Sequence, residues 1–502
     1  MPASQLRILD PLTAEPLPHG TMPRPVAYLG DHVLVRGLTE ATRAGALDLL
    51  RKAAQSLGLD IVEPRASKVE SMLREDPELA RRLDLIWTTT VTVVRADGPP
   101  ADAWPVLQRA RRLDPALARH LQLDHLVQLA PDYQGMPYYV SMPYYVSMPY
   151  YVSMPTGGPP AAEYTRAGSG GRAPVAVVLP DPALRARQLR RPPLVVVPDT
   201  GLGSHPWFTD PARATDVVHA RGFRLGLGGD VPAISGPPSA PDPLQGRVAP
   251  YAGHATFIAG LVRQVCPEAR LQVISLFDDA GTMPEGALLE VLVLLLVRQW
   301  DVLDGRGAVE DLIDVLSLSL GYYHEDPDDA LEDVPLRLVL DEFGRSGTAV
   351  VASAGNQATT DKLYPAAFAG HTAPFDASRV PLVSVGALNP DLTTVAYFSN
   401  AGDWVSCQRA GAALVSTLPC DLDGELQSAA ARVAVGQQRA TIDPENFRGG
   451  FATWSGTSFA GPVLAAQVAA RLVDDPRLDD TDASTGVGRG WSALTAELGW
   501  TP

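Results

Sequence analysis

Four short motifs carry side chains that could hydrolyse an acyl bond, and they occur in the chain order Asp, His, Asn, Ser. Ser458 lies in the stretch Gly456–Pro462, which reads GTSFAGP and leads into an apolar run. A tight turn followed by a helix would place this hydroxyl where backbone N–H groups and the helix dipole favour negative charge. Taken alone, the motif is more often an ordinary helix N-cap serine. A nucleophile needs a base and an acidic partner elsewhere in the chain.

Asp199 and His254 have the residue types and positions for those two roles. Asp199 follows the apolar run 194–197, and at the carboxyl end of a strand it could orient an imidazole; the alternative is a solvated turn aspartate. His254 begins an apolar helical pattern. A charged imidazolium is disfavoured at a helix N-terminus, so it needs an acidic neighbour there. Asp199 could be that neighbour, and a capping or simply buried histidine is the alternative.

Asn356 could supply a hydrogen-bond donor for the reacting carbonyl oxygen. It follows the apolar strand pattern 349–353 and the dipeptide Ala354-Gly355. Removing one such donor costs about two to four kcal/mol of transition-state stabilisation, so acyl-transfer chemistry needs it. An asparagine in a common turn is the alternative interpretation.

The segments that carry these motifs alternate between strand and helix patterns from about residue 174 onward. The predicted strands are 175–179, 194–197, 271–276, 313–318, 349–353 and 380–385, and the predicted helices are 256–265, 284–300, 335–346 and a last one after Ser458. Such alternation predicts an α/β domain with a mostly parallel sheet covered by helices on both faces. Sites in these sheets lie at the carboxyl ends of the strands, as Asp199 and Asn356 do.

A second, smaller domain is predicted at residues 26–130, after a proline-rich, loose arm at 1–25. Its predicted strands are 27–29, 32–35, 59–62, 86–94 and 125–129, and its predicted helices are 39–57 and 101–113. Counting the first two short strands as one, the order β-α-β-β-α-β indicates a ferredoxin-like α+β fold. No catalytic constellation falls inside it, so an accessory or inhibitory module is expected.

A linker at 131–173 separates this module from the predicted catalytic domain at 174–502. It contains three copies of the hexapeptide MPYYVS, and a proline in every sixth position argues against a central strand. A tandem duplication in a tolerant linker is one interpretation. Accessible bait for a peptide-binding groove is the other.

Composition excludes several classes of function. A formal net charge of −16 over 502 residues argues against nucleic acid or an anionic membrane as the main partner. The first ten residues do not form a secretory signal, and the apolar run 287–297 is too short to cross a bilayer. Three cysteines exclude a disulfide framework and favour free thiols. We therefore expect a cytoplasmic protein.

Together, the four motifs resemble those of the subtilisin-like serine proteases, whose triad has the order Asp, His, Ser. The matching segments are Asp199–Gly201, Gly253–Thr256, Ala354–Asn356 and Gly456–Pro462, with further support from Ser317–Gly321. The resemblance covers about residues 194–475, and the module at 26–130 resembles the family's prodomain. Ala255 stands where the family usually has glycine, and Phe459 replaces a common methionine.

The resemblance implies a role for each matched residue. Ser458 would be the nucleophile, His254 the general base, Asp199 its orienting partner, and Asn356 the oxyanion-hole donor together with the Ser458 N–H. An extended peptide substrate would bind by strand addition between two segments, which are Ser319, Leu320, Gly321 on one side and Ala352, Ser353, Ala354, Gly355 on the other.

The resemblance also implies peptide or protein substrates, a self-inhibited and self-processing form, and an intramolecular prodomain as partner. We expect neither nucleic acid nor a membrane as partner, and no cofactor. Many family members bind Ca²⁺, but no acidic cluster here has loop-ligand spacing, and Asp326–Asp329 is more simply a solvated turn. Two alternatives remain open: a dedicated maturation protease for one precursor, and a proteolytically silent binding protein on the same fold.

Overall fold

The computed structural model describes residues 6–97, 100–129, 171–177, 179–232, 246, 248–277, 281–326, 331–369, 375–425 and 427–502. The hexapeptide repeats of the predicted linker lie outside these residues. The chain divides into two compact units. The first contains Met1–Val127, Met283–Val297 and Tyr322–Glu342, and the second contains Gln128–Thr282, Arg298–Gly321 and Phe343–Pro502.

The first unit is built on an antiparallel sheet with the strand order β5-β2-β4-β3. Its strands are β2 (Ala27–Arg36), β3 (Asp60–Val62), β4 (Thr88–Val94) and β5 (Leu121–Leu129), and its two long helices are α1 (Glu40–Ser56) and α4 (Ala103–Leu113). The order is that of the ferredoxin-like β-α-β-β-α-β fold, as the sequence predicts. The last two residues of β5 belong to the second unit.

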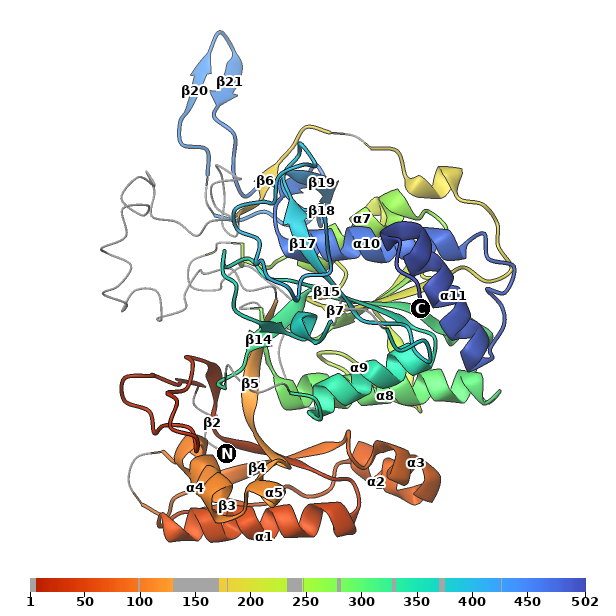
Figure 1. The fold of residues 1–502 in the computed structure, drawn as a ribbon. Helices are drawn as coiled ribbons and strands as arrows, with labels where there is room; N and C mark the ends of the chain where they lie inside the picture. Colours follow the sequence, from red (N-terminus) through yellow and green to blue (C-terminus); the bar gives the residue numbers. More distant parts are fainter. Residues whose placement is uncertain are drawn as a thin grey trace. The chain divides into compact units, whose positions relative to one another are not determined.

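Alternation along the strands decides what each face of this sheet buries. Val33 and Val35 point into a core that they share with α1 and α4, which pack together on one face (Figure 1). Leu34 points to the opposite face, where the beginning of α8 (Glu285–Leu303) covers it. A Cβ added at Gly286 would lie 2.9 Å from Leu34 Cδ2, so the helix can approach this closely only without a side chain there.

The N-terminal segment differs from the predicted loose arm. Leu6–Ile8 form strand β1, which pairs antiparallel with β2, and Leu9 and Leu17 are buried. The predicted strands 27–29 and 32–35 are one continuous strand. Further short helices were missed because each buries only a few side chains: α2 (Lys68–Glu75), α3 (Pro77–Leu83) and α5 (Pro115–Ala118).

Glu290 of α8 makes the stability of the first unit depend on pH. Burial and the charge of Glu70, itself paired with Arg43, raise the pKa of Glu290 to about 7. The folded state therefore binds more protons than the unfolded chain between about pH 4.5 and 7. Because stability falls as pH rises wherever the folded state holds the extra proton, this unit should lose stability across that window.

Glu290→Gln should remove this loss, because an amide stays neutral at every pH. We expect the variant to be more stable than the wild type by about 3 kcal/mol at pH 8 and nearly unchanged at pH 4. Urea unfolding followed at both pH values measures the difference. Glu75→Gln, which removes an exposed acid from α2, is the control and should show no such pH dependence. An equal gain at both pH values would contradict the explanation.

The second unit contains a seven-stranded sheet with the order β18-β17-β15-β13-β7-β11-β8, in which every neighbouring pair is parallel. The strands are β7 (Leu194–Asp199), β8 (Ala214–Thr215), β11 (Arg270–Ser275), β13 (Ile313–Leu318), β15 (Ala349–Ser353), β17 (Val383–Leu388) and β18 (Cys407–Ala410). The central strands β7, β13 and β15 are buried at every residue, as expected for a parallel sheet covered on both faces.

Helices α7 (His254–Val265) and α10 (Thr457–Leu472) pack together and against this sheet, with α11 (Ala483–Leu498) beside α10 (Figure 1). Their apolar side chains join those of β7, β11 and β17 in one core. The α/β architecture with a mostly parallel sheet is the predicted one. Helix α9 (Pro335–Arg345) also forms close to its predicted bounds.

Some strands of the second unit differ from the predicted ones or were not predicted. The predicted strand 175–179 is wrong: the strand here is β6 (Ala173–Pro174), which pairs with β22 (Phe451–Trp454), itself paired with β19 (Leu414–Thr417). The proline at 174 and the exposed side chain of Ala176 explain why a longer, buried strand does not form here. Residues 421–450 contain an exposed hairpin of β20 (Ala431–Ala434) and β21 (Gln437–Ala440).

Short strands and turns complete the described part: β9 (Val218–Ala220), β10 (Phe223–Leu225), β12 (Thr282–Pro284), β14 (Leu320–Tyr323) and β16 (Leu363–Tyr364). Cys266, Cys407 and Cys420 are free thiols, and only Cys266 is fully buried. Among the described residues, no helix combines the length and the apolar character needed to cross a bilayer.

Candidate active site

Asp199 and His254 form a buried pair in the second unit. Nδ1 of His254 lies 2.9 Å from both carboxylate oxygens of Asp199, and the two residues are 0% and 2% exposed. The N–H of Thr200 donates to Asp199 Oδ1 at 2.7 Å and fixes the carboxylate. A carboxylate accepts hydrogen bonds, so the Nδ1 that faces it carries the proton and Nε2 keeps its lone pair. The histidine is thus held in the tautomer that a general base requires.

Strand β7 carries Asp199 as its last residue, at the carboxyl end of the sheet. The beginning of this strand is anchored by Asp314, which accepts the Leu194 N–H at 2.8 Å and pairs with the buried Arg191 through two bonds of 2.7 and 2.8 Å. At the other end, the Leu276 N–H donates to the Asp199 carbonyl oxygen. Both ends of the strand are therefore fixed, which fixes the carboxylate.

The turn at Gly253 places His254 at the first position of α7. Gly253 has φ +79°, and a Cβ there would lie 2.7 Å from Pro419, so both the backbone conformation and the space require glycine. The Thr200 hydroxyl accepts the Ala255 N–H at 3.2 Å and ties the helix start to the end of β7. The ring of His254 packs against Phe459, with ring centres 5.2 Å apart.

Thr457, the residue before Ser458, holds the side chain of Asn356 at the start of α10. Both the N–H and the hydroxyl of Thr457 donate to Asn356 Oδ1, at 2.8 and 2.9 Å, and the Thr457 hydroxyl accepts the Gly355 N–H at 3.0 Å. With its oxygen engaged, the Asn356 side chain presents its NH₂ group away from Thr457. The Ser319 hydroxyl donates to the Ser458 carbonyl oxygen at 2.9 Å.

The structure brings the four predicted catalytic side chains to one end of the sheet, though not into one continuous hydrogen-bonded chain. Within the described part of the protein, no hydrogen bond joins Ser458 Oγ to His254 Nε2. The link between the two helix starts is instead the Phe459 ring, which contacts His254. Catalytic hydrogen bonds are often long without substrate and shorten when it binds, so this geometry remains compatible with base catalysis.

Another segment of the same unit pairs with the backbone of β14 at Leu320 and Gly321. They pair antiparallel with Leu129 and Gln128, the last two residues of β5. The Leu129 N–H also donates to the Gly281 carbonyl oxygen at 3.0 Å, and the Leu129 side chain is fully buried. An extended segment thus lies along β14 by strand addition. The sequence pattern did not identify Gln128 and Leu129 as partners of this edge.

The other predicted substrate-binding segment has backbone groups that are already paired inside the parallel sheet. It contains Ala352, Ser353 and Ala354. Ala352 and Ser353 pair with β17, and the Ala354 N–H donates to the Val385 carbonyl oxygen. The Ser353 hydroxyl donates to the Thr457 carbonyl oxygen at 2.9 Å. These residues support the start of α10. Gly355, with φ +101°, has no room for a side chain beside Asn400.

One group of described residues could hold a metal ion, and it lies in the first unit, away from these residues in the chain: His125, His324 and Glu325.

Comparison with known proteins finds one family model that matches part of the chain. Residues 245–484 match the model of the Subtilase family. No curated protein matches the sequence. Among solved structures, the chain is similar to fervidolysin from Fervidobacterium pennivorans, a keratinolytic enzyme related to subtilisin, at 18% identity and a TM-score of 0.44, covering 89% of this chain and 55% of that one.

A lanthipeptide protease is also similar, at 18% identity and a TM-score of 0.37, covering 62% of this chain and 76% of the other. The match to fervidolysin covers 55% of that protein, so this chain spans about half of its length.

Proposed function

We propose that the protein is a serine endopeptidase that cleaves peptide bonds through an acyl-enzyme on Ser458, and the match of residues 245–484 to the model of the Subtilase family supports this. The observation that carries the proposal is the buried pair in which both oxygens of Asp199 lie 2.9 Å from His254 Nδ1. A carboxylate in this position holds the imidazole for base catalysis and stabilises the imidazolium that forms during the reaction.

Each residue then has one task in the reaction. His254 Nε2 takes the proton from Ser458 Oγ as this oxygen attacks the peptide carbonyl carbon. The oxyanion that forms accepts hydrogen bonds from the Asn356 NH₂ and from the Ser458 backbone N–H at the start of α10. His254 next donates the proton to the leaving amine, which departs and leaves the acyl-enzyme. Water, activated by His254, hydrolyses the ester and restores the serine.

Replacing Asn356 should have a moderate effect on catalysis, because it is the proposed side-chain donor to the oxyanion. Asn356→Ala should lower kcat by about 10²- to 10³-fold with little change in KM, because the donor acts mainly on the transition state. Steady-state kinetics on a peptide substrate measures both constants. Asn400→Ala is unsuitable as a control, since Asn400 supports Gln357 and Ala354. Asn389→Ala, at an exposed turn, is the matched control and should keep kcat within twofold.

We also propose that the chain is made in a self-inhibited form. Gln128 and Leu129 lie along Leu320 and Gly321 as a bound peptide would, so a substrate has to displace them before it reaches the β14 edge. Leu129 is the last described residue before the predicted linker, and cleavage beyond it, between about 131 and 193, would free the edge.

Self-processing has a direct test on a gel. Purified wild-type protein should convert from one band to two with time, whereas Ser458→Ala should remain full length. If both proteins stay full length, self-processing is wrong although the catalytic proposal can still hold. If both are cut at the same rate, another protease makes the cut.

A further inference from the structure

A buried cluster of ionisable side chains lies in the first unit and takes no part in the proposed catalysis. His125 of β5 is 1% exposed, and both of its ring nitrogens contact carboxylates. Nδ1 lies 2.8 Å from Glu285 Oε2, and Nε2 lies 2.9 Å from Glu325 Oε2. Glu285 begins α8, and Glu325 follows β14, so three separate chain segments of this unit meet at one imidazole.

His324 completes a set of three metal-ligand types. Its Nε2 lies 3.3 Å from the same Glu325 oxygen that contacts His125, and the ligand atoms of the three residues all lie within 4.8 Å of one another. Four-coordinate Zn²⁺ holds nitrogen and oxygen ligands at about 2.0–2.2 Å, which places neighbouring ligand atoms about 3.3 Å apart. The two contacts made by Glu325 are close to that spacing.

Side chains that contact His125 on the side away from Glu325 hold its ring in an orientation typical of metal sites. Glu285 contacts His125 on the ring nitrogen opposite Glu325, and it also accepts the Tyr322 hydroxyl at 3.1 Å. The Tyr322 ring stacks on His125 with centres 4.6 Å apart. Metal-bound histidines commonly have their second nitrogen held by a carboxylate or a backbone group in this way.

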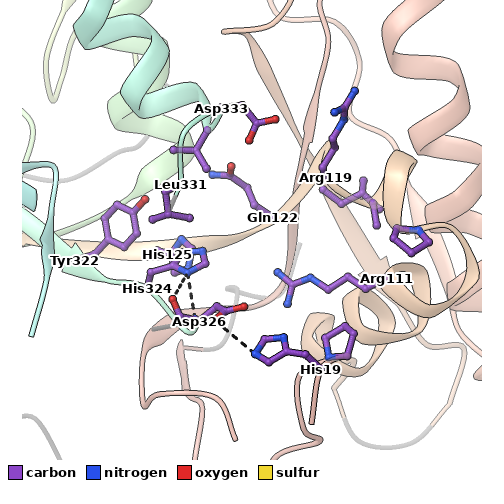
Figure 2. Close-up of a pocket in the computed structure, with 15 residues that line it drawn as sticks. His19, Arg111, Arg119, Gln122, His125, Tyr322, His324, Asp326, Leu331 and Asp333 are labelled. Carbon is purple, nitrogen blue, oxygen red and sulfur yellow. Dashed lines mark hydrogen bonds and ion pairs between the residues drawn. The ribbon is translucent and has the colours of Figure 1, made fainter. Parts of the chain in front are cut away.

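The second nitrogen of His324 is held by the backbone. Its Nδ1 accepts the Asp326 N–H at 3.1 Å and lies 3.3 Å from the Asp326 carbonyl oxygen (Figure 2). In the tautomer that accepts this N–H, Nε2 carries a proton directed at Glu325, and a cation would displace that proton.

Charge and space also fit a small divalent cation. Both ring nitrogens of His125 donate to carboxylates, so without a cation the His125 imidazolium and Arg111, 2.9 Å from Glu325 Oε1, balance the charges of Glu285 and Glu325. Loss of the His125 proton to solvent would leave a net negative charge that suits a divalent cation. A cavity of about 270 Å³ is lined by His125, His324 and Asp326 among others, so water can reach the two histidines (Figure 2).

We propose that His125, His324 and Glu325 form a Zn²⁺ site, with Glu285 orienting His125. Two imidazoles and a carboxylate are ligands suited to Zn²⁺ and unsuited to Ca²⁺, which prefers oxygen ligands alone. The cation would replace the proton shared by His125 and Glu325, and would join β5 to the segment after β14 and, through Glu285, to α8. This inference concerns the first unit and does not depend on the proposed protease activity.

The test uses the full-length chain carrying Ser458→Ala, so that no self-cleavage occurs, after treatment with a chelator. Titration with ZnCl₂ should give one tightly bound ion per chain and a higher thermal midpoint, and CoCl₂ should give the visible absorption bands of four-coordinate Co²⁺. Adding His324→Ala should weaken Zn²⁺ binding at least tenfold and remove both the bands and the thermal shift.

Two comparisons keep the proposal falsifiable. His324 is the least buried of the three ligands, at 8% exposed, so its removal leaves the His125 bonds to Glu285 and Glu325 in place; circular dichroism checks the fold. His219→Ala removes an exposed histidine from β9 and should bind Zn²⁺ like the parent. No stoichiometric binding, equal binding by His324→Ala, or a loss caused by His219→Ala would each overturn the proposal.

Discussion

Replacing Ser458 with alanine is expected to lower kcat/KM for peptide hydrolysis by about 10⁵-fold and to leave the fold unchanged. The hydroxyl is the proposed nucleophile, and without it no acyl-enzyme can form. The contacts that position this residue come from its carbonyl oxygen and from Thr457, so the substitution leaves them in place. The measurement is steady-state hydrolysis of a peptide after the chain has been cut within 131–170 by an added protease, which is then removed.

Ser455→Ala is the matched control for this prediction. Ser455 lies three residues earlier and is also buried, and its hydroxyl accepts the Ala413 N–H at 2.8 Å. Losing this bond should cost about 1 kcal/mol of stability and leave activity within a few-fold of the wild type. If Ser458→Ala is no less active than Ser455→Ala, Ser458 is not the nucleophile.

Asp199→Asn should lower kcat by about 10⁴-fold with only a small change in KM. An asparagine can face His254 with its NH₂ group, which donates to Nδ1 and moves the imidazole proton to Nε2. Nε2 then has no lone pair with which to accept the serine proton. The variant keeps the size of the side chain, so a large effect would reflect the tautomer of His254 and not a cavity.

The pH dependence of kcat separates this explanation from general loss of structure. Part of the activity of Asp199→Asn should return at high pH, where hydroxide can serve as the base, and circular dichroism should match the wild type. Asp210→Asn, which changes an exposed aspartate soon after β7, should keep full activity. A loss of less than tenfold in Asp199→Asn would contradict the assigned role.

The sequence predicts the two domain types and the positions of the four candidate residues because these depend on local patterns. Buried strands such as β7 and β15 are continuous apolar runs, and each ends where Asp199 or the Asn356 turn begins. The turn glycines Gly253 and Gly355 can also be identified from the sequence. Each position has a positive φ and no room for a side chain, and glycine meets both requirements.

The sequence does not reveal contacts between distant segments that lack a local signature. The antiparallel pairing of Gln128 and Leu129 with Leu320 and Gly321 joins segments almost 200 residues apart in the chain. The His125 contacts to Glu285 and Glu325 span 160 and 200 residues, and the adjacent pair His324-Glu325 gives no sign in the sequence that His125 lies beside it. Thr457, which holds Asn356, looks like an ordinary residue of a Gly-Thr-Ser turn.

The central claim is that Ser458 is a nucleophile activated by His254, and labelling with a fluorophosphonate tests it most directly. Such a probe reacts with an activated serine, and mass spectrometry of the digested protein locates the adduct. The wild-type chain, cut within 131–170, should carry one adduct on Ser458, and His254→Ala should carry none. A folded, cut wild-type protein without an adduct on Ser458, or equal labelling of His254→Ala, would contradict the claim.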